Sequence, residues 1–351
     1  MVGNLFKPDI LNNQAKFPSV DIIIVNWNGL EHLSVCLSSL LNQSYINKNI
    51  FFVDNGSDDQ SIEYVGENFP SIQVISLESN FGFCGGNNVG IRNSKSEFVA
   101  LINNDTEADI NWLNNSVNTL LNNPEAGFVA SRLCNYNERN IIDSCGDLYY
   151  RSGYPEKRGW LLNFSDDYNK QMWVFGACAG AALYRRSMLE NIGLFDIDFF
   201  NYMEDVDLSF RAQLYGYRCI YEPKAVVYHK VGATSSLNSK ARTYWSHRNH
   251  WYAIIKNFPS KLLLKYSLHI LIADFLVFIS SIIQGNIFLF FQARMEVIKN
   301  LPKLLNKRKK IQEKKKVNSQ YIDSIISKNW IKQRIKNKKL ENVFTRNKPL
   351  S

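Results

Sequence analysis

The first 135 residues alternate short apolar runs with longer stretches in which apolar residues recur every three or four positions. The runs at residues 20–27 and 50–53 have the composition of buried parallel strands. The spacing between them predicts a helix over Leu30–Leu41. The same two patterns predict further elements at 57–68, 73–77, 98–102, 109–121 and 127–133. Strands that alternate with helices at this spacing indicate a doubly wound α/β sheet.

Polar side chains follow three of the predicted strands at their carboxyl ends. Asn26 and Asn28 follow the first strand, Asp54 the second, and Asn104 and Asp105 the fourth. Asn and Asp are ordinary loop residues, so one such loop would indicate nothing. Ligands of open α/β sheets bind beyond the carboxyl ends of the strands. Three loops of this kind therefore favour a nucleotide site at that edge.

Residues 80–90 contain four glycines. Their spacing matches neither the G-x-G-x-x-G fingerprint nor a P-loop, which disfavours hydride transfer on NAD and P-loop nucleotide hydrolysis. The glycines would let the backbone approach a ligand closely before a helix. The alternative is a flexible loop with a helix start.

Residues 195–208 contain five carboxylates among large aromatic residues. Buried carboxylates are costly unless they are paired, hydrogen-bonded or metal-bound, and such surroundings tune carboxyl groups for proton transfer. The plainer interpretation is a helix start, in which Asp207 pairs with Arg211 one turn later. We expect that pair. For Glu204 and Asp205 we favour proton transfer, because the preceding aromatic residues can exclude water.

The net charge of +9 is unevenly distributed over the 351 residues. Residues 299–351 hold 17 Lys and Arg against 3 acidic residues, a net of +14, whereas residues 1–298 carry a net of −5. An acidic body argues against nucleic-acid binding, and a basic tail favours an anionic surface. The six cysteines show no zinc spacing and suit core positions in a reducing compartment. The first ten residues lack a long apolar segment, so we expect no secretory signal.

The composition changes after residue 257. Residues 262–291 are strongly apolar, and the uncharged piece at 275–293 is just long enough to span a membrane as a helix. Polar residues in its middle favour two shorter helices in the membrane interface, or a helical hairpin. The alternative is a soluble helical subdomain or an oligomer contact. The lysine clusters at 307–310 and 314–316 would be drawn to anionic lipids. Further apolar residues interleave the basic tail at positions 322, 325, 326, 330 and 331.

Several blocks of the sequence together resemble the inverting glycosyltransferases of family 2. The similarity is greatest to the rhamnosyltransferase-like enzymes of bacterial polysaccharide assembly, and it covers about residues 20–257. The blocks that carry it are 25–29, 53–59, 80–90, 101–106, 195–211, 226–230 and 247–249. The resemblance implies a GT-A fold, an α/β architecture with a mostly parallel sheet flanked by helices. A C-terminal helical extension that associates with membranes would follow it.

These observations predict a division of the chain into four parts. They are an extension at 1–18, a transferase domain at 19–257, an apolar membrane-associating segment at 258–298 and a basic amphipathic tail at 299–351. Within the transferase domain, residues 19–134 would bind the nucleotide sugar and residues 135–257 the acceptor. Residues 135–170 lack periodicity and are expected to form a long loop or hairpin over the active site.

On the donor side, the resemblance implies that Asp54 accepts a hydrogen bond from the imide of a pyrimidine base. Arg248 is a candidate for the diphosphate, with a surface arginine as the alternative. The residues assigned to the donor are Asn26, Asn28, Asp54, Asn80, Asn104, Asp105 and Arg248.

Asp105 stands at the end of the family's metal-binding D-x-D motif, whose first position is Asn103 here. The resemblance therefore implies weak, donor-assisted binding of Mg²⁺ or Mn²⁺, which would neutralise the departing diphosphate. His229 matches a position that can supply another ligand, and a structural histidine is an equally good interpretation.

On the acceptor side, the resemblance assigns the catalytic base to the pair Glu204 and Asp205. We favour Asp205 as the base and Glu204 as a residue that orients the acceptor, although coupled carboxylates leave this assignment open. Trp173 and Gly180 would lie near the acceptor, where a tryptophan can stack on a sugar. The alternative for their stretch is a packed strand.

The resulting hypothesis is a transferase that moves L-rhamnose from dTDP-rhamnose to a hydroxyl of a lipid-linked or cell-surface glycan, such as an O-antigen or cell-wall polymer. It would work in the cytoplasm, on the inner face of the plasma membrane, and its oligomeric state is left open. A UDP-hexose donor is an alternative within the same class. A non-catalytic sugar-binding module is an alternative outside it, against which the intact carboxylates argue. Nucleic acid is not an expected partner.

Overall fold

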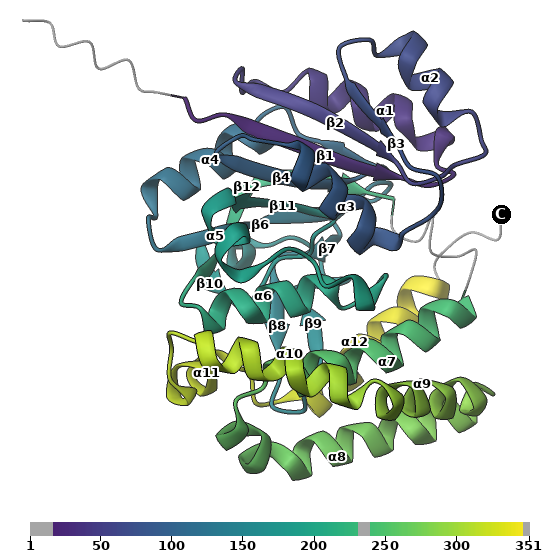
Figure 1. Cartoon of the computed structure of the whole chain (residues 1–351), viewed down its shortest axis with the longest axis vertical. Helices are drawn as coiled ribbons and strands as arrows, with labels where there is room; N and C mark the ends of the chain where they lie inside the picture. Colours follow the sequence, from purple (N-terminus) through teal and green to yellow (C-terminus); the bar gives the residue numbers. More distant parts are fainter. Residues whose placement is uncertain (1–16, 231–238, 347–351) are drawn as a thin grey trace, which may run out of the picture.

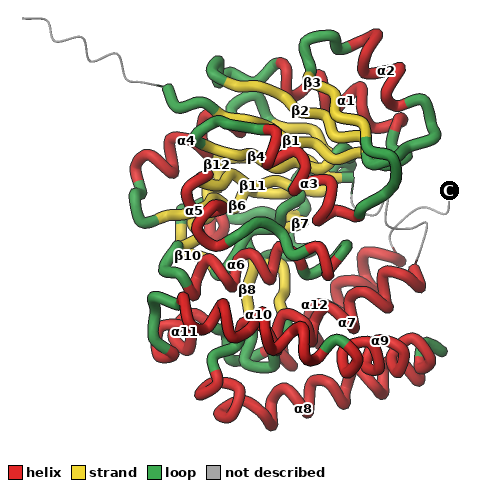
Figure 2. Tube along the Cα trace, in the orientation of Figure 1, coloured by secondary structure: helices red, strands yellow, loops and turns green. Residues whose placement is uncertain are grey.

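A computed structural model of the protein describes residues 17–230 and 239–346 (Figures 1 and 2). Almost all of the extension expected at residues 1–18 lies outside this part of the chain. A mixed sheet with helices against both faces forms one half of the molecule, and a layer of C-terminal helices packs beside it. The chain is thus α/β, with a helical extension at its end.

The described residues form a ten-stranded sheet with the main order β10-β12-β6-β11-β4-β1-β2-β3. Strand β1 pairs in parallel with both β2 and β4, and β11 runs antiparallel between β4 and β6. A separate antiparallel pair, β8–β9, forms the hairpin expected within residues 135–170. The strands are β1 (Val20–Asn26), β2 (Lys48–Asp54), β3 (Gln73–Ser76), β4 (Phe98–Asn103), β5 (Thr106–Ala108), β6 (Ala126–Asn135), β7 (Ile142–Ser144), β8 (Asp147–Tyr149), β9 (Pro155–Lys157), β10 (Met172–Val174), β11 (Ala181–Arg185) and β12 (Arg218–His229).

The helices fall into an early group that covers the sheet and a late group that follows it. The early helices are α1 (Leu30–Leu41), α2 (Ser61–Asn68), α3 (Gly82–Asn93), α4 (Trp112–Asn122), α5 (Arg186–Ile192) and α6 (Glu204–Leu214), with 3-10 turns η1 (Asp166–Tyr168) and η2 (Ile197–Phe199). The late helices are α7 (Ser239–Asn257), α8 (Ser260–Ile283), α9 (Ile287–Lys299), α10 (Leu301–Lys314), α11 (Ser319–Ile325) and α12 (Trp330–Arg346).

The near-continuous apolar character of the central strands reflects burial on both faces of the sheet. Ile22 and Ile24 of β1 belong to one hydrophobic cluster, and Ile23 belongs to the other. Successive side chains of a strand point to opposite faces, so a strand covered on both sides has no polar face. The predicted helix Leu30–Leu41 is α1, with the same bounds.

The glycine-rich stretch serves helix packing. It forms most of α3, which lies against β1. A Cβ atom on Gly86 would come within 2.6 Å of Val25 Cγ1, and one on Gly90 within 2.4 Å of Ile23 Cγ2. These two glycines therefore let the helix approach the strand closely, whereas the sequence had favoured close approach to a ligand.

The residues expected to form a basic tail pack against the rest of the fold. Leu304, Ile311, Ile322 and Ile326 are buried in the same cluster as core residues of the sheet, and the Trp330 ring stacks on Tyr154. Positions 322, 326 and 330, expected on an amphipathic tail, are thus interior residues. They stabilise the fold and are not available to an external surface.

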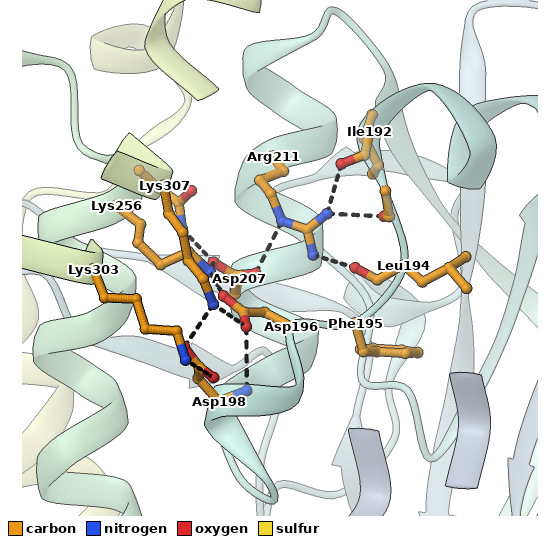
Figure 3. Close-up of polar contacts among 12 residues, drawn as sticks. Ile192, Leu194, Phe195, Asp196, Asp198, Asp207, Arg211, Lys256, Lys303 and Lys307 are labelled. Atoms are coloured by element: carbon orange, nitrogen blue, oxygen red, sulfur yellow. Dashed lines mark hydrogen bonds and ion pairs between the residues drawn. The ribbon is translucent and has the colours of Figure 1, made fainter. Parts of the chain in front are cut away.

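A buried ion-pair network fixes α6 against the helices that follow it (Figure 3). Asp207 pairs with Arg211 at 2.9 Å, as the sequence predicted, and Lys256 of α7 adds a second pair at 2.7 Å. Burial would raise the pKa of Asp207, but Lys256 and Arg211 hold it below its ordinary value. Both cations are needed to keep this carboxylate charged in the interior.

The same network extends from α7 to α10 through the loop before α6. Lys256 also contacts Asp196 at 2.6 Å, and Lys307 of α10 contacts both Asp196 and Asp198, at 2.5 and 2.6 Å. Arg308 donates to the carbonyls of Ile255 and Phe258. Two cations of the lysine cluster expected to meet a membrane thus bind their own chain.

We predict that Lys256→Ala lowers the free energy of unfolding by about 3–5 kcal/mol, because it removes a cation from the buried Asp207 and from the partly buried Asp196. Urea denaturation followed by circular dichroism measures the loss. The matched control is Lys303→Ala, whose side chain is 56% exposed and, among the described residues, pairs only with Asp198. The control should cost about 0–1 kcal/mol. Equal losses in the two variants would contradict the assigned role of Lys256.

Candidate active site

The polar residues at the ends of β1, β2 and β4 come together as the sequence predicted. The β1–β2 register places Asn26 beside Asp54. Asn26 Nδ2 donates to Asp54 Oδ1 at 3.2 Å, and Asn104 Nδ2 donates to Asn26 Oδ1 at 2.6 Å. All three side chains are buried. They form a hydrogen-bonded floor at the carboxyl edge of the sheet.

Asp54 lies within this floor and not on its surface. Its side chain is fully buried, and Oδ2 accepts a hydrogen bond from the backbone N–H of Ser57 at 2.9 Å. Asn26 and Ser57 thus bind both oxygens of the carboxylate beneath the loop, and its contact with a nucleotide base stays a prediction. Here Asp54 positions the loop that follows β2.

Asn28 and Asn80 belong to neighbouring loops of the same edge. Asn28 is exposed, has a φ of 51°, and its Oδ1 accepts from the backbone N–H of Asp58 at 2.9 Å. Asn80 Oδ1 accepts from Asn55 Nδ2 at 3.0 Å and from the N–H of Gly82 at 2.8 Å. Both asparagines thus shape the loops above the floor.

Two aromatic side chains that the sequence reasoning passed over stand in these loops. Among the described residues up to 230, the exposed Phe and Trp side chains are Phe17, Trp27 and Phe81. Trp27 is 44% exposed and lies next to Asn26, and Phe81 is 51% exposed and follows Asn80. Exposed aromatic rings beside a polar floor are suited to stacking on a base. The available signal was a tryptophan at the last position of the first predicted strand.

Asp105 and His229 face each other at the neighbouring end of the sheet. Pairing of β5 with β12 places His229 opposite Thr106, and Asp105 Oδ1 lies 3.3 Å from His229 Nε2. That oxygen is buried without a well-formed hydrogen bond. On the other side of the ring, His229 Nδ1 contacts Asp143 Oδ2 at 3.0 Å. Burial would lower the pKa of His229, but Asp105 and Asp143 raise it to about 9.

This arrangement fits a divalent cation. An unpartnered carboxylate oxygen and an imidazole nitrogen converge on one point, and Asp143 would fix the ring and its tautomer from behind. Asp143 is itself held by Lys157 at 2.8 and 2.9 Å. Within residues 17–230 and 239–346, no group of three His, Cys, Asp or Glu side chains could hold a metal by itself. Asp105 and His229 would therefore need further ligands from the donor phosphates.

A strained loop precedes the candidate base. Phe200, Tyr202 and Met203 have φ angles of 62°, 68° and 68°, a left-handed region that is costly for such residues. The fully buried Asn249 restrains the loop, because its Nδ2 donates to the carbonyls of Phe199, Asn201 and Tyr202 at 2.8–2.9 Å.

Arg248 holds the same loop. Its Nη2 donates to the carbonyls of Asp198 and Phe199 at 2.8 and 3.0 Å. The sequence had placed Arg248 at the donor diphosphate. In the structure its guanidinium supports the loop before α6, and its contact with a diphosphate stays a prediction.

Glu204 and Asp205 begin α6 directly after this loop and have different surroundings. Glu204 is buried, its Oε2 has no hydrogen-bond partner, and burial together with Asp205 raises its pKa well above the ordinary value. Asp205 is half-buried and accepts hydrogen bonds from the N–H groups of Val206 at 2.8 Å and Ala179 at 3.4 Å. Burial raises its pKa as well, while these hydrogen bonds lower it. The pKa of Glu204 is thus the one raised further, and Asp205 stays the predicted base.

The β8–β9 hairpin supplies a third carboxyl group, Asp147, which the sequence reasoning missed. Burial and the charge of Asp205 raise the pKa of Asp147 to about 8. Lys157, from the same hairpin, partly opposes this shift. Residues 135–170 have no periodic pattern, so only the folded hairpin reveals that Asp147 comes within electrostatic reach of Asp205.

Gly180 lies next to the end of β4, whereas Trp173 lies on an edge strand of the sheet. The Gly180 carbonyl accepts from the N–H of Asn103 at 3.0 Å, so its segment touches the end of β4. Trp173 lies on β10 at the edge of the sheet, and the Arg218 guanidinium covers its ring at 3.6 Å. Trp173 therefore does not offer this face to a sugar, and the packed-strand interpretation holds for it.

Comparison with known proteins identifies the family. Residues 21–193 match the sequence model of glycosyl transferase family 2. The poly-beta-1,6-N-acetyl-D-glucosamine synthase of Staphylococcus epidermidis (strain ATCC 35984 and synonyms) is 25% identical over 268 residues, which cover 76% of this chain and 63% of that protein. The Staphylococcus aureus (strain COL) synthase is 25% identical over 272 residues, with the same two coverages. The chain thus spans under two thirds of these relatives.

Solved structures share the fold. GalNAc-T7, crystallised with UDP, GalNAc and Mn²⁺, aligns with a TM-score of 0.55 at 15% identity, covering 70% of this chain and 49% of that one. The mannosyltransferase PcManGT from Pyrobaculum calidifontis, in complex with GDP-Man and Mn²⁺, aligns with a TM-score of 0.52 at 16% identity, covering 84% and 85%. The S. aureus TarS 1–349 structure aligns with a TM-score of 0.51 at 17% identity, covering 84% and 90%.

We predict that Glu204→Gln stabilises the protein at pH 8 by about 0.5–2 kcal/mol, the usual range when an unfavourable site is relieved. The folded pKa of Glu204 lies above its ordinary value of 4.5, so its stabilisation is complete below pH 4.5 and is lost as the pH rises. The advantage of the variant should therefore vanish at pH 4.5. Thermal unfolding at both pH values measures this difference. The exposed Glu190→Gln is the control, and a pH-independent effect of Glu204→Gln would refute the assignment.

Proposed function

This chain belongs to glycosyl transferase family 2, and we propose that it transfers a hexose, with inversion, from a nucleoside diphosphate sugar to a hydroxyl group of a glycan. The observation that carries the proposal is the convergence of two half-sites. The Asp105–His229 pair follows β4, and the Asp205 carboxylate contacts Ala179. The hydrogen bond from Asn103 to Gly180 joins these two segments.

The donor half-site would bind the nucleotide at the carboxyl edge of β1, β2 and β4. Trp27 and Phe81 offer aromatic faces to the base, and Asn28 offers an exposed amide. Asp105 and His229 would hold a divalent cation, which neutralises charge on the diphosphate leaving group when bound. Asp143 orients His229 for this purpose, and Lys157 keeps Asp143 ionised.

The acceptor half-site supplies the base. Asp205 would remove the proton of the acceptor hydroxyl as its oxygen forms a bond to the anomeric carbon and the bond to the diphosphate oxygen breaks. Attack from the side opposite the leaving group inverts the anomeric centre. A base with a raised pKa holds the proton more strongly, which favours this transfer. Glu204 keeps its own proton and can donate a hydrogen bond without adding a second negative charge.

The donor would be either dTDP-rhamnose or a UDP-sugar. The similarity of the sequence blocks to rhamnosyltransferase-like enzymes supports dTDP-rhamnose. The staphylococcal relatives are named for N-acetyl-D-glucosamine, and GalNAc-T7 was crystallised with UDP, which supports a UDP-sugar. The acceptor would be a growing polysaccharide, as the names of the relatives suggest.

We predict that Asp205→Asn lowers the rate of sugar transfer by about 10²–10⁴-fold while nucleotide binding is retained, because the amide cannot accept the proton. Product formation from a radiolabelled donor measures the rate, and calorimetry measures nucleotide binding. Asp166→Asn, at an exposed carboxylate of η1, is the control and should keep the wild-type rate. Transfer near the wild-type rate by Asp205→Asn would remove Asp205 as the base.

We also predict that Mn²⁺ increases the thermal stabilisation given by a nucleoside diphosphate, and that Asp105→Ala abolishes this increase. Ligands that bind the native state raise the melting temperature by mass action. The screen compares dTDP, UDP, GDP and CDP with and without Mn²⁺. Its control is Glu107→Ala, a nearby carboxylate that Arg139 already pairs.

A metal-dependent shift with dTDP would favour rhamnosyl transfer, and one with UDP would favour a UDP-sugar donor. If no nucleotide changes the melting temperature of the wild-type protein, the transferase proposal fails and the non-catalytic module becomes the better account.

A further inference from the structure

Helices α8 and α9 lie on the side of the molecule away from the sheet (Figure 1), and many of their large apolar side chains are exposed. We call this surface the apolar platform and define it as the exposed large apolar side chains between residues 264 and 298. The most exposed of them are Leu264, Leu268, Ile283, Phe288, Met295 and Ile298, each more than 60% exposed. Monomeric soluble proteins seldom expose contiguous apolar patches of this kind without a partner.

The platform is one face of each helix. On α8, the exposed Leu264, Leu268, Leu271 and Phe275 recur every three or four residues, whereas Tyr266 and Ile270 are buried in the core cluster. The same spacing relates Phe288, Phe291, Met295 and Ile298 on α9.

Aromatic contacts connect the two helical faces into one surface. Phe278 of α8 lies 6.2 Å from the exposed Phe275 and 6.1 Å from the exposed Phe291 of α9, measured between ring centroids. The apolar residues of α8 and α9 are therefore adjacent in the fold and can contact a single partner.

Helix α8 is anchored along its length and so lies against the body of the protein. By length and composition it is the one described helix that could cross a membrane, with 24 residues and a mean hydropathy of 2.0. However, Asp274 accepts from Trp251 Nε1 at 2.9 Å and pairs with Arg294, whose Nη1 donates to the His247 carbonyl at 2.8 Å. Spanning would break these contacts and expose the polar groups to hydrocarbon, at high cost. A partner must therefore meet the outer face alone.

The charge around the platform selects the partner. Residues 260–314 contain ten Lys and Arg and three acidic residues, a net of +7. Lys261, Lys299 and Lys309 are exposed. Lys261 and Lys299 stand at helical spacing from the platform residues Leu264 and Met295, and Lys309 stands one turn after the exposed Leu305 of α10. Long lysine side chains at the border of an apolar face can reach lipid headgroups.

We propose that the apolar platform docks on an anionic lipid bilayer, with α8 and α9 lying flat in the interface and the lysines at the phosphate level. An apolar face bordered by cations complements the acyl boundary and the anionic headgroups of such a surface. A two-fold dimer through this face would instead bring two positively charged surfaces together. The sequence predicted an apolar segment that associates with membranes. The fold adds which side chains of α8 and α9 are exposed and how α8 is held against the rest of the protein.

Docking would place the acceptor-side loop close to the membrane. The Asp196 and Asp198 carboxylates next to η2 are bound by Lys307 of α10, and α10 continues from α9. This last consequence rests on the proposed function, since it suits an acceptor that is carried by a lipid. The docking itself does not depend on transferase activity.

Flotation of the full-length protein with vesicles tests the proposal. One vesicle is phosphatidylcholine alone and the other contains about 30% phosphatidylglycerol. We expect the protein to float with the anionic vesicles and at least 10-fold less with the neutral ones. Leu268→Glu with Phe275→Glu should lower flotation at least 10-fold. Lys299→Glu with Lys309→Glu should reduce it to the level of neutral vesicles, since each lysine near a membrane contributes to binding.

The matched control is Ile46→Glu, in the loop between α1 and β2. Ile46 is 78% exposed and belongs to the sheet half of the molecule, so this variant should float like the wild type. Flotation that is absent in the wild type, or unchanged in the Leu268 and Phe275 variant, would overturn the proposal. A dimer on size exclusion that this variant dissociates, without vesicle binding, would assign the platform to a second copy instead.

The nucleotide-dependent shift in melting temperature is recorded for every variant in the absence of vesicles. A variant that keeps this shift is folded, so its loss of flotation reports on the platform alone. A wild type that floats without responding to any nucleotide would support docking and contradict the transferase proposal, which keeps the two results distinguishable.

Discussion

The burial of the Asp207 carboxylate is the constraint on which much of the site depends. Asp207 lies in the first turn of α6 and is fully buried, and Arg211, Lys256 and Asn257 all bind it. A charge in the interior requires such partners, so α6 cannot move without α7. The position of the Glu204–Asp205 pair at the start of α6 is thereby fixed relative to the helical extension.

The loop before α6 keeps an unfavourable conformation because the neighbouring helices hold it. Three left-handed residues and an unpartnered Glu204 oxygen are individually unfavourable. They persist because Asn249 and Arg248 bind the loop carbonyls and Lys307 binds its carboxylates. The C-terminal helices therefore restrain the loop that precedes the proposed base from within the fold. Only the lysines that remain outside these contacts are available to a partner surface.

The sequence by itself determined the parts that depend on local periodicity. The apolar runs of β1 and β2, the spacing in α1 and the pair between Asp207 and Arg211 follow from patterns within a few residues. The meeting of Asn26, Asp54 and Asn104 also followed, because parallel strands bring their carboxyl ends to one edge. The family resemblance then indicated which chemistry this edge serves, and it correctly identified the fold.

Only the tertiary structure decided the roles that depend on long-range packing. His229 meets Asp143 across 86 residues of sequence, and Asp147 comes within electrostatic reach of Asp205 through a hairpin without a periodic signal. Burial removed Asp54 from the surface of the crevice, and the cation–π contact with Arg218 covered Trp173. Local sequence fixes which residues are apolar or charged. Which of them are buried, paired or exposed depends on neighbours that only the folded chain brings together.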